Sequence, residues 1–248
     1  MKPLLRWTLA FVFVLSLNCA ARAQNHPASP CSAGRSAYAS MEVSLSAGCP
    51  FSATVEERRT QTLGDGTRLQ TKAKSLVYRD SYGRVAYYAY QPVGLDEPYP
   101  DSANFIQIWD TVAGFHYVLL PERSHVATRF SLNPPASSFQ RSAPPTPPQP
   151  RPKVTVEQLG TQDILGFLVT GERMTRTYPV GAQHNDRPIT VVTEIWHSPD
   201  LGLDFLRKGS DPRNADEEFR ITSFDQSEPD AALFQLPAGY TVEDQKNR

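Results

Sequence analysis

The chain has 248 residues, and its 25 basic and 26 acidic residues give a formal net charge of −1 at pH 7. This length is enough for one large β domain or two small ones, and the balanced charge gives no sign of a polyanionic partner. Residues 51–90 are locally basic with interleaved tyrosines, but the solvated face of a sheet accounts for that composition better than a nucleic-acid surface does. We therefore expect no nucleic-acid partner.

The first 23 residues have the pattern of a cleaved export signal. Lys2 and Arg6 precede an apolar run at 9–17, and Ala21–Ala23 supplies the small residues of a signal-peptidase site. A lipoprotein signal with Cys19 as the acylated residue is the alternative, although the residues before Cys19 match such a signal poorly. We expect cleavage near Ala23, a mature chain without a transmembrane segment, and a periplasmic or extracellular location.

Residues 24–50 are rich in Ala, Ser, Gly and Pro, and the lack of a clear period predicts an irregular or partly helical segment. This segment contains Cys31 and Cys49, the two cysteines of the expected mature chain. An even pair in an oxidising compartment favours a disulfide, which would stabilise the fold by about 3 kcal/mol. A redox or zinc site would require C-x-x-C spacing or nearby histidines, and the sequence has neither.

From Phe51 the sequence takes on the period-two alternation of β-strands. Gly64-Asp65-Gly66 predicts a tight hairpin turn, and a second turn at 80–83 makes residues 51–90 a three-stranded meander. Residues 105–109 and 115–120 predict another hairpin. Prolines then fill residues 133–153, and because proline lacks the N–H of a sheet ladder, we expect an exposed loop there. A ligand for a proline-recognising module is the alternative interpretation of this loop.

The second half of the chain predicts further strands. Residues 154–159 are followed by an expected turn at Gly160, and then by a strand at 167–178. Residues 189–206 predict a hairpin whose Ile-Trp strand end and late glycine match the hairpin at 105–120, as two copies of one design would. If 179–187 is a simple connection, Arg173 lies across the strand pair from Glu194. Residues 218–224 predict a strand, 227–236 a short helix, and 240–242 a return to the sheet.

These elements predict a mainly β fold, built as an antiparallel curved sheet or half-barrel with a few short helices. Each side of the proline-rich loop offers too few strands for a closed core, so we expect one sheet assembled from both halves. The expected organisation is a signal peptide at 1–23, an irregular segment at 24–50, a single antiparallel β domain at 51–242 interrupted by the loop at 133–153, and a tail at 243–248.

The sequence contains none of the common catalytic or cofactor motifs. G-x-S-x-G, a phosphate loop, a dinucleotide fingerprint and H-E-x-x-H are all missing. Ser124 and His125 are neighbours in sequence, which does not make a Ser-His dyad. The other candidates for metal or acid–base chemistry are better explained as strand-end and turn residues: His26, His116, His184, His197, Asp200, Asp204, Asp211 and Asp216. We predict no catalytic, cofactor-binding or metal-binding residue, and a non-enzyme rather than an enzyme; a hydrolase with a scattered site is the alternative.

Aromatic residues give the only positive indication of function. On curved antiparallel strands, one concave face could accept an apolar ligand, and the residues predicted to form it are Trp109, Phe115, Tyr117, Trp196 and Phe205. The alternative is an ordinary core packed beneath a helix. For Trp196, the question is whether the indole points into a packed core or into an open groove.

Two resemblances to known protein groups add to these predictions. The stretches E-Q-L-G-T-Q-D-I-L-G-F-L-V-T-G, T-E-I-W-H-S-P, K-G-S-D-P-R and S-E-P-D-A-A-L-F-Q-L-P-A-G-Y-T-V resemble a group of uncharacterised exported β proteins of acidobacteria, which implies no activity. The order of hairpins, short helix and final strand is similar to periplasmic lipoprotein-carrier half-barrels, whose members hold acyl chains or sense envelope stress. No ligand-binding residue of that second family can be matched to this sequence.

The sequence therefore predicts an exported, non-catalytic binding protein without a cofactor. Its expected role is that of a carrier or receptor for a lipid or other apolar ligand in the cell envelope. The alternative is a protein-interaction or envelope-stress sensing module whose partner is an envelope protein.

Overall fold

The structure, a computed structural model, describes residues 37–38, 41–42, 49–132 and 150–245. Within these ranges the chain is almost entirely β-strand, with one short 3-10 helix, η2 (Ala231–Phe234). The strands of the first half are β1 (Ala37–Tyr38), β2 (Met41–Glu42), β3 (Phe51–Thr62), β4 (Arg68–Arg79), β5 (Val85–Ala89), β6 (Val93–Gly94), β7 (Phe105–Asp110), β8 (Phe115–Leu119) and β9 (Val126–Ser131). Those of the second half are β10 (Lys153–Ile164), β11 (Phe167–Tyr178), β12 (Ile189–Ser198), β13 (Leu203–Ser210), β14 (Asp216–Asp225) and β15 (Thr241–Asp244).

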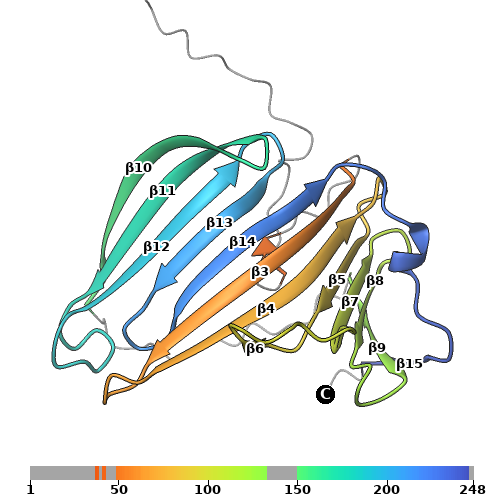
Figure 1. The fold of residues 1–248 in the computed structure, drawn as a ribbon, viewed down its shortest axis with the longest axis horizontal. Coiled ribbons are helices and arrows are strands. Elements are labelled where there is room, and N and C mark those ends of the chain that lie inside the picture. Colours follow the sequence, from red (N-terminus) through yellow and green to blue (C-terminus); the bar gives the residue numbers. More distant parts are fainter. Residues whose placement is uncertain (1–36, 39–40, 43–48, 133–149, 246–248) are drawn as a thin grey trace, which may run out of the picture.

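One 13-stranded sheet contains all strands except the small β1–β2 pair, in the order β10-β11-β12-β13-β14-β3-β4-β5-β7-β8-β9-β15, with β6 paired to β4 (Figure 1). The two halves of the chain meet where β14 pairs antiparallel with β3. At the far end, β15 pairs with β9 in parallel. The predicted mainly β, antiparallel curved sheet is therefore confirmed.

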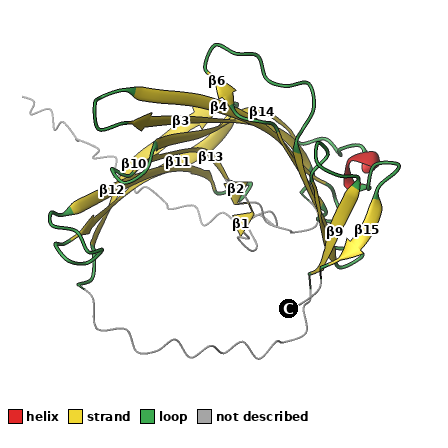
Figure 2. Cartoon of the chain, turned by 90° about the horizontal axis from the view of Figure 1, so that it is seen from below, coloured by secondary structure: helices red, strands yellow, loops and turns green. Residues whose placement is uncertain are grey.

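The sheet curves into an arch, which Figure 2 shows from below. β1 and β2 lie beneath the arch, and η2 lies outside it, beside the limb that contains β5 and β7. Side chains alternate between the two faces of a strand. Val77 and Trp109 belong to one buried cluster, whereas their neighbours Tyr78 and Ile108 belong to a second cluster that includes Phe234 of η2. On these strands the second cluster therefore faces outward and the first faces the inside of the arch.

The two clusters differ in composition. The first, which we call the phenylalanine cluster, is built around Phe51, Phe205 and Phe219, and the partly buried Phe167 and Phe224 pack against it. The second, the tyrosine cluster, has a small-residue and isoleucine core and a surround that includes Tyr78, Tyr88, Tyr90, Tyr117 and Tyr240. The Tyr88 hydroxyl donates to the Leu233 carbonyl at 2.8 Å and so helps to fix η2. Burial of these side chains supplies the main favourable term of folding.

The strand at the start of the second half corrects one prediction. Gly160 is not a turn, because β10 continues through it to Ile164, and the turn to β11 lies at Leu165-Gly166. Gly160 has a φ of 86°, and the pairing with β11 shifts between Gln158 and Gly160. A glycine with positive φ accommodates the extra residue of a β-bulge, which bends a strand without ending it.

Several local predictions are confirmed. η2 forms within the expected short helical segment, with the Asp230 side chain accepting the Ala232 N–H as an N-cap. β15 supplies the expected return to the sheet. The hairpins β7–β8 and β12–β13 have matching turns, in which Gly114 and Gly202 adopt positive φ and donate to a carbonyl four residues back. Among the described residues, no helix has the length and apolar character needed to cross a membrane.

Other predictions fall on residues outside the described ranges. These are the signal peptide at 1–23, most of the segment at 24–50, and residues 133–149 of the proline-rich loop predicted at 133–153. The last residue of that predicted loop, Lys153, is the first residue of β10. Cys49 is buried and disulfide-bonded. The other cysteines of the chain, Cys19 and Cys31, lie outside the described residues, so the pairing of Cys49 with Cys31 stays a prediction.

Candidate functional site

The five aromatic residues predicted to form an apolar-ligand face are distributed over both faces of the sheet. Trp109 and Phe205 are buried in the phenylalanine cluster. Trp109 is paired with His116 across β7 and β8, and the two rings stack with centroids 4.7 Å apart. Phe115 and Tyr117 flank His116 in sequence, so their side chains point to the opposite face, where Tyr117 packs against the tyrosine cluster. The structure therefore brings three of the five predicted residues to the phenylalanine cluster: Trp109, Phe205 and Trp196.

Trp196 is a partly buried cover of the phenylalanine cluster rather than a free groove residue. Its ring lies against Gly171, the residue directly across the β11–β12 pair. Its Nε1 donates to Glu194 Oε1 at 2.8 Å. This hydrogen bond, followed by that from Arg173, lowers the pKa of Glu194. The indole thus has an apolar side packed on the sheet and a polar edge held by a carboxylate.

Four phenylalanines from four strands converge at one end of the phenylalanine cluster. They are Phe51 on β3, Phe167 on β11, Phe205 on β13 and Phe224 on β14. The Phe224 ring lies 5.1 to 5.4 Å from each of the other three, measured between centroids. Phe51, Phe167 and Phe224 are not among the residues that the sequence predicts for the apolar-ligand face. The available signal was that Phe51 and Phe167 each open a strand directly after a turn-forming residue, Pro50 and Gly166.

A hollow of about 110 Å³ adjoins these rings, which we call the aromatic hollow; its lining residues are Cys49, Pro50, Phe51, Arg79, Leu201, Phe224 and Gln226. Arg79 is buried, and its Nε donates to the Cys49 carbonyl at 2.6 Å. Its guanidinium carbon lies 4.8 Å from the centroid of the Phe51 ring, a cation–π distance. Burial lowers the pKa of Arg79 to about 10, so the group stays cationic at neutral pH. The aromatic hollow therefore joins apolar walls to one fixed positive charge.

The cluster borders a polar region at Phe219. A second hollow of about 260 Å³ is lined by Glu57, Thr193, Arg207, Gly209, Glu217 and Phe219. Phe219 is itself a buried member of the phenylalanine cluster, and the Arg207 guanidinium lies over its ring at 5.6 Å. Apolar and charged surfaces therefore meet at this one residue.

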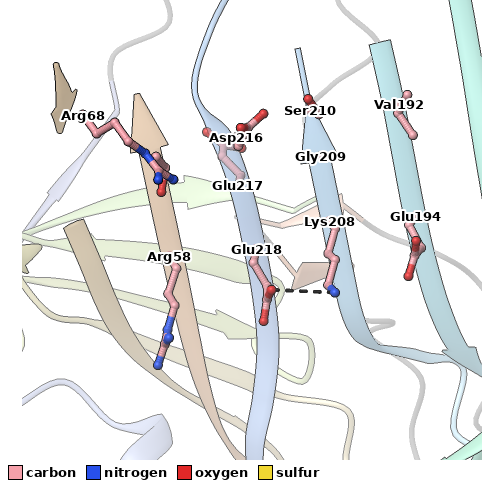
Figure 3. Close-up of a pocket in the computed structure, with 11 residues that line it drawn as sticks. Arg58, Arg68, Val192, Glu194, Lys208, Gly209, Ser210, Asp216, Glu217 and Glu218 are labelled. Atoms are coloured by element: carbon pink, nitrogen blue, oxygen red, sulfur yellow. Dashed lines mark ion pairs between the residues drawn. The ribbon is translucent and has the colours of Figure 1, made fainter. Parts of the chain in front are cut away.

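A third hollow is a charged depression of about 420 Å³ that crosses β3, β4, β12, β13 and β14 (Figure 3). Its lining alternates in charge, with Arg58, Arg68 and Lys208 among Glu194, Asp216, Glu217 and Glu218. Lys208 Nζ lies 3.9 Å from Glu218 Oε2. Such a lining does not suit an apolar ligand. The lowered pKa of Glu194 is also opposite to the rise that a general acid requires.

Within the described residues, the histidines considered for catalysis are not joined to a nucleophile; His26 lies outside these residues. His197 Nδ1 lies 2.7 Å from Asp204 Oδ1, yet within the described residues no hydroxyl is hydrogen-bonded to its other ring nitrogen. The His125 ring stands beside the Tyr240 ring, with the two centroids 5.4 Å apart. Burial between aromatic rings lowers the pKa of His116 to about 4. In the ranges that the structure covers, no three His, Cys, Asp or Glu side chains gather as a metal site would require.

Comparison with known proteins identifies no sequence family: no family model matches this chain, and no curated protein matches it. Solved structures give distant matches in the arrangement of strands. MucB matches with a TM-score of 0.38 and 13% identity over 77% of this chain and 58% of MucB. A LolA superfamily protein from Nitrosomonas europaea matches with a TM-score of 0.31 and 11% identity over 76% of this chain and 90% of that protein. Lipoprotein LppX from Mycobacterium tuberculosis matches with a TM-score of 0.30 and 13% identity over 72% of this chain and 88% of LppX.

The chain spans less than two thirds of the length of MucB. At TM-scores of 0.38 and below, these likenesses are too distant to transfer a ligand or a binding residue. The resemblance to exported acidobacterial proteins stays a prediction.

Proposed function

We propose that this protein is an exported, non-catalytic binding protein that holds the apolar part of a lipid or similar amphiphile against the phenylalanine cluster. The observation that carries the proposal is the convergence of Phe51, Phe167, Phe205 and Phe224 beside the aromatic hollow. Aromatic rings offer large apolar contact areas, and ligand sites combine such walls with a few polar groups that fix orientation.

The polar groups at the borders of the cluster favour an amphiphile over a pure hydrocarbon. Arg79 places a buried positive charge on the wall of the aromatic hollow. Phe219 of the phenylalanine cluster also lines the hollow of about 260 Å³, together with Arg207 and Glu57. A ligand with an apolar chain and a charged or polar head would match both surfaces.

Size limits how such a ligand enters. The aromatic hollow, at about 110 Å³, is smaller than the roughly 300–1,000 Å³ of sites for drug-sized ligands. It accepts the end of a chain, and a longer chain requires outward movement of the partly buried Phe167 and Phe224 rings. We treat residues 51–242 as one functional domain, since the phenylalanine cluster takes residues from strands of both halves.

Native mass spectrometry of the mature protein, purified from the envelope of its own host, tests the proposal. We expect a co-purifying apolar molecule of defined mass, and binding of the apolar fluorophore N-phenylnaphthylamine that a free fatty acid displaces. Leu201→Gln places an amide in the aromatic hollow, where Leu201 is 7% exposed, and should weaken fluorophore binding about tenfold or more.

Arg68→Gln is the matched control, because Arg68 lines the charged depression and not the aromatic hollow. This variant should bind the fluorophore as the wild type does. A wild-type protein that neither carries an apolar molecule nor binds the fluorophore would overturn the proposal. Equal loss of binding in the two variants would also count against it.

A further inference from the structure

The outer edge of β10 is a long strand edge open to solvent. β10 stands at one end of the 13-stranded sheet, and in the described part of the chain it pairs only with β11. Ten of its 12 residues are exposed, including Val154 at 48% and Val156 at 55%. The edge strand at the other end, β15, has four residues. Open edges carry unpaired N–H and C=O groups that can pair with another strand.

The first five residues of β10, Lys153 to Glu157, read K-V-T-V-E and are complementary to themselves in the antiparallel direction. A second copy related by a two-fold axis through Thr155 places Lys153 opposite Glu157 and Val154 opposite Val156. Opposite charges directly across an antiparallel pair stabilise it, and like charges destabilise it. A two-fold interface uses the same patch on both copies, so each favourable pair occurs twice.

The chain on either side of this segment limits the pairing to these residues. Lys153 to Gln158 pair one-to-one with β11, and the bulge follows between Gln158 and Gly160. In the two-fold arrangement Gln158 of one copy falls opposite Pro152 of the other. Proline has no N–H to donate to a ladder. The regular, self-complementary stretch therefore ends at the same point on both copies.

Charge on the neighbouring strands also favours a second copy as the occupant. Arg173 Nη1 lies 3.0 Å from Glu157 Oε2, and Arg173 Nη2 lies 3.1 Å from Glu194 Oε2. The two carboxylates therefore share one arginine as their ion-pair partner. Lys153 has no ion-pair partner among the described residues. In the paired arrangement, Lys153 of the second copy adds the missing positive charge at Glu157. On the other face of the strand, the exposed Val154 and Val156 side chains of the two copies would cover one another.

We propose that the chain forms a two-fold dimer in which Lys153–Glu157 of β10 pairs antiparallel with the same residues of a second copy, which joins the two sheets. This interaction surface lies on β10, away from the residues that line the aromatic hollow. The proposal is therefore independent of the ligand.

Sedimentation analysis of the mature protein over a range of concentrations tests the dimer. We expect a reversible monomer–dimer equilibrium for the wild type. Lys153→Glu sets two carboxylates opposite each other at both ends of the pairing, and Glu157→Lys sets two ammonium groups there. Each single variant should raise the dimer dissociation constant about tenfold or more.

The decisive measurement is an equimolar mixture of the two single variants. In the mixed pair the charges are complementary again, so a heterodimer should form where each variant alone is a monomer. Glu243→Lys on β15, at the opposite edge of the sheet, is the charge-reversal control and should dimerise like the wild type. A wild type that is monomeric at every concentration, a dimer that both single variants leave intact, or a mixture that stays monomeric would each overturn the proposal.

Discussion

Replacement of Gly171 by alanine tests the packing of Trp196 on β11. A Cβ at this position would lie 2.6 Å from Cζ3, 2.7 Å from Cη2 and 2.8 Å from Cε3 of the Trp196 ring. A Cβ essentially never lies within 3.0 Å of a non-bonded atom, so the indole must move. Its displacement also threatens the 2.8 Å hydrogen bond from Nε1 to Glu194.

The expected cost follows from three terms. Overpacking of this kind costs about 1–3 kcal/mol, and a weakened, partly solvated hydrogen bond adds about 0.5–1.5 kcal/mol. Gly171 has no positive φ, so alanine regains the roughly 0.5–1 kcal/mol that a glycine costs within a strand. The net destabilisation is about 0.5–4 kcal/mol, with the middle of the range near 2 kcal/mol, and each kcal/mol lowers Tm by about 2–4 °C.

Urea denaturation followed by tryptophan fluorescence measures this change and also reports the indole environment. The emission of folded Gly171→Ala should shift to longer wavelength as the Trp196 ring moves toward solvent. Gly209→Ala is the matched control: Gly209 also lies within a strand, and nothing stands within 4 Å of its added Cβ. That variant should equal or slightly exceed the wild type in stability. If Gly171→Ala is as stable as Gly209→Ala, the reasoning about Trp196 is wrong.

Three further substitutions test other parts of the sheet. Leu165 has a φ of 57° at the β10–β11 turn, so Leu165→Asn should raise the free energy of unfolding in urea by about 0.5–1 kcal/mol, and a loss would show that the leucine contacts matter more. Burial lowers the pKa of His116 from 6.5 to about 4, so the unfolded chain takes up a proton that the folded chain does not, and stability is lost as pH falls from 6.5 toward 4. His116→Phe should flatten that fall in a Tm-against-pH series, whereas replacement of the exposed His125 should leave it unchanged. Arg173→Gln removes an exposed ion pair with Glu157 and a partly buried one with Glu194 and should lower the urea midpoint only slightly; a fall as large as that of Gly171→Ala would give these pairs a larger role than their exposure implies.

Local sequence pattern was enough to predict the hairpins and some of their contacts. The hairpin predicted at 189–206 is β12 and β13, because alternation of apolar and polar residues and a turn signal are both local properties. The predicted neighbours Arg173 and Glu194 pair across β11 and β12, with Nη2 and Oε2 3.1 Å apart. Register across a hairpin depends only on the connecting turn, which explains why this contact could be predicted.

The errors and omissions concern contacts that the local pattern does not encode. A glycine with positive φ suits both a turn and a bulge, and the partner strand β11 decides that Gly160 is a bulge. The aromatic hollow depends on Phe51 and Phe224 meeting across β3 and β14. Nothing in either strand alone indicates that the first half of the chain pairs with the second there. The face of the sheet on which Trp109 and Phe115 each lie likewise depends on the register between β7 and β8. Amino-acid composition does not determine that register.

The pairing of β14 with β3 also has a consequence for the order of folding. Thr222 and Thr54, which are hydrogen-bonded across this seam, lie 168 residues apart in the chain. Because the chain emerges from its N-terminus, β3 is exposed for a time before its neighbour β14 follows. During that time one edge of β3 is an open template for pairing with other chains. Substitutions that weaken β14 should therefore have a larger effect on the yield of folded protein than on its free energy of unfolding. The reason is that they lengthen the period in which aggregation competes with the pairing of β14 and β3.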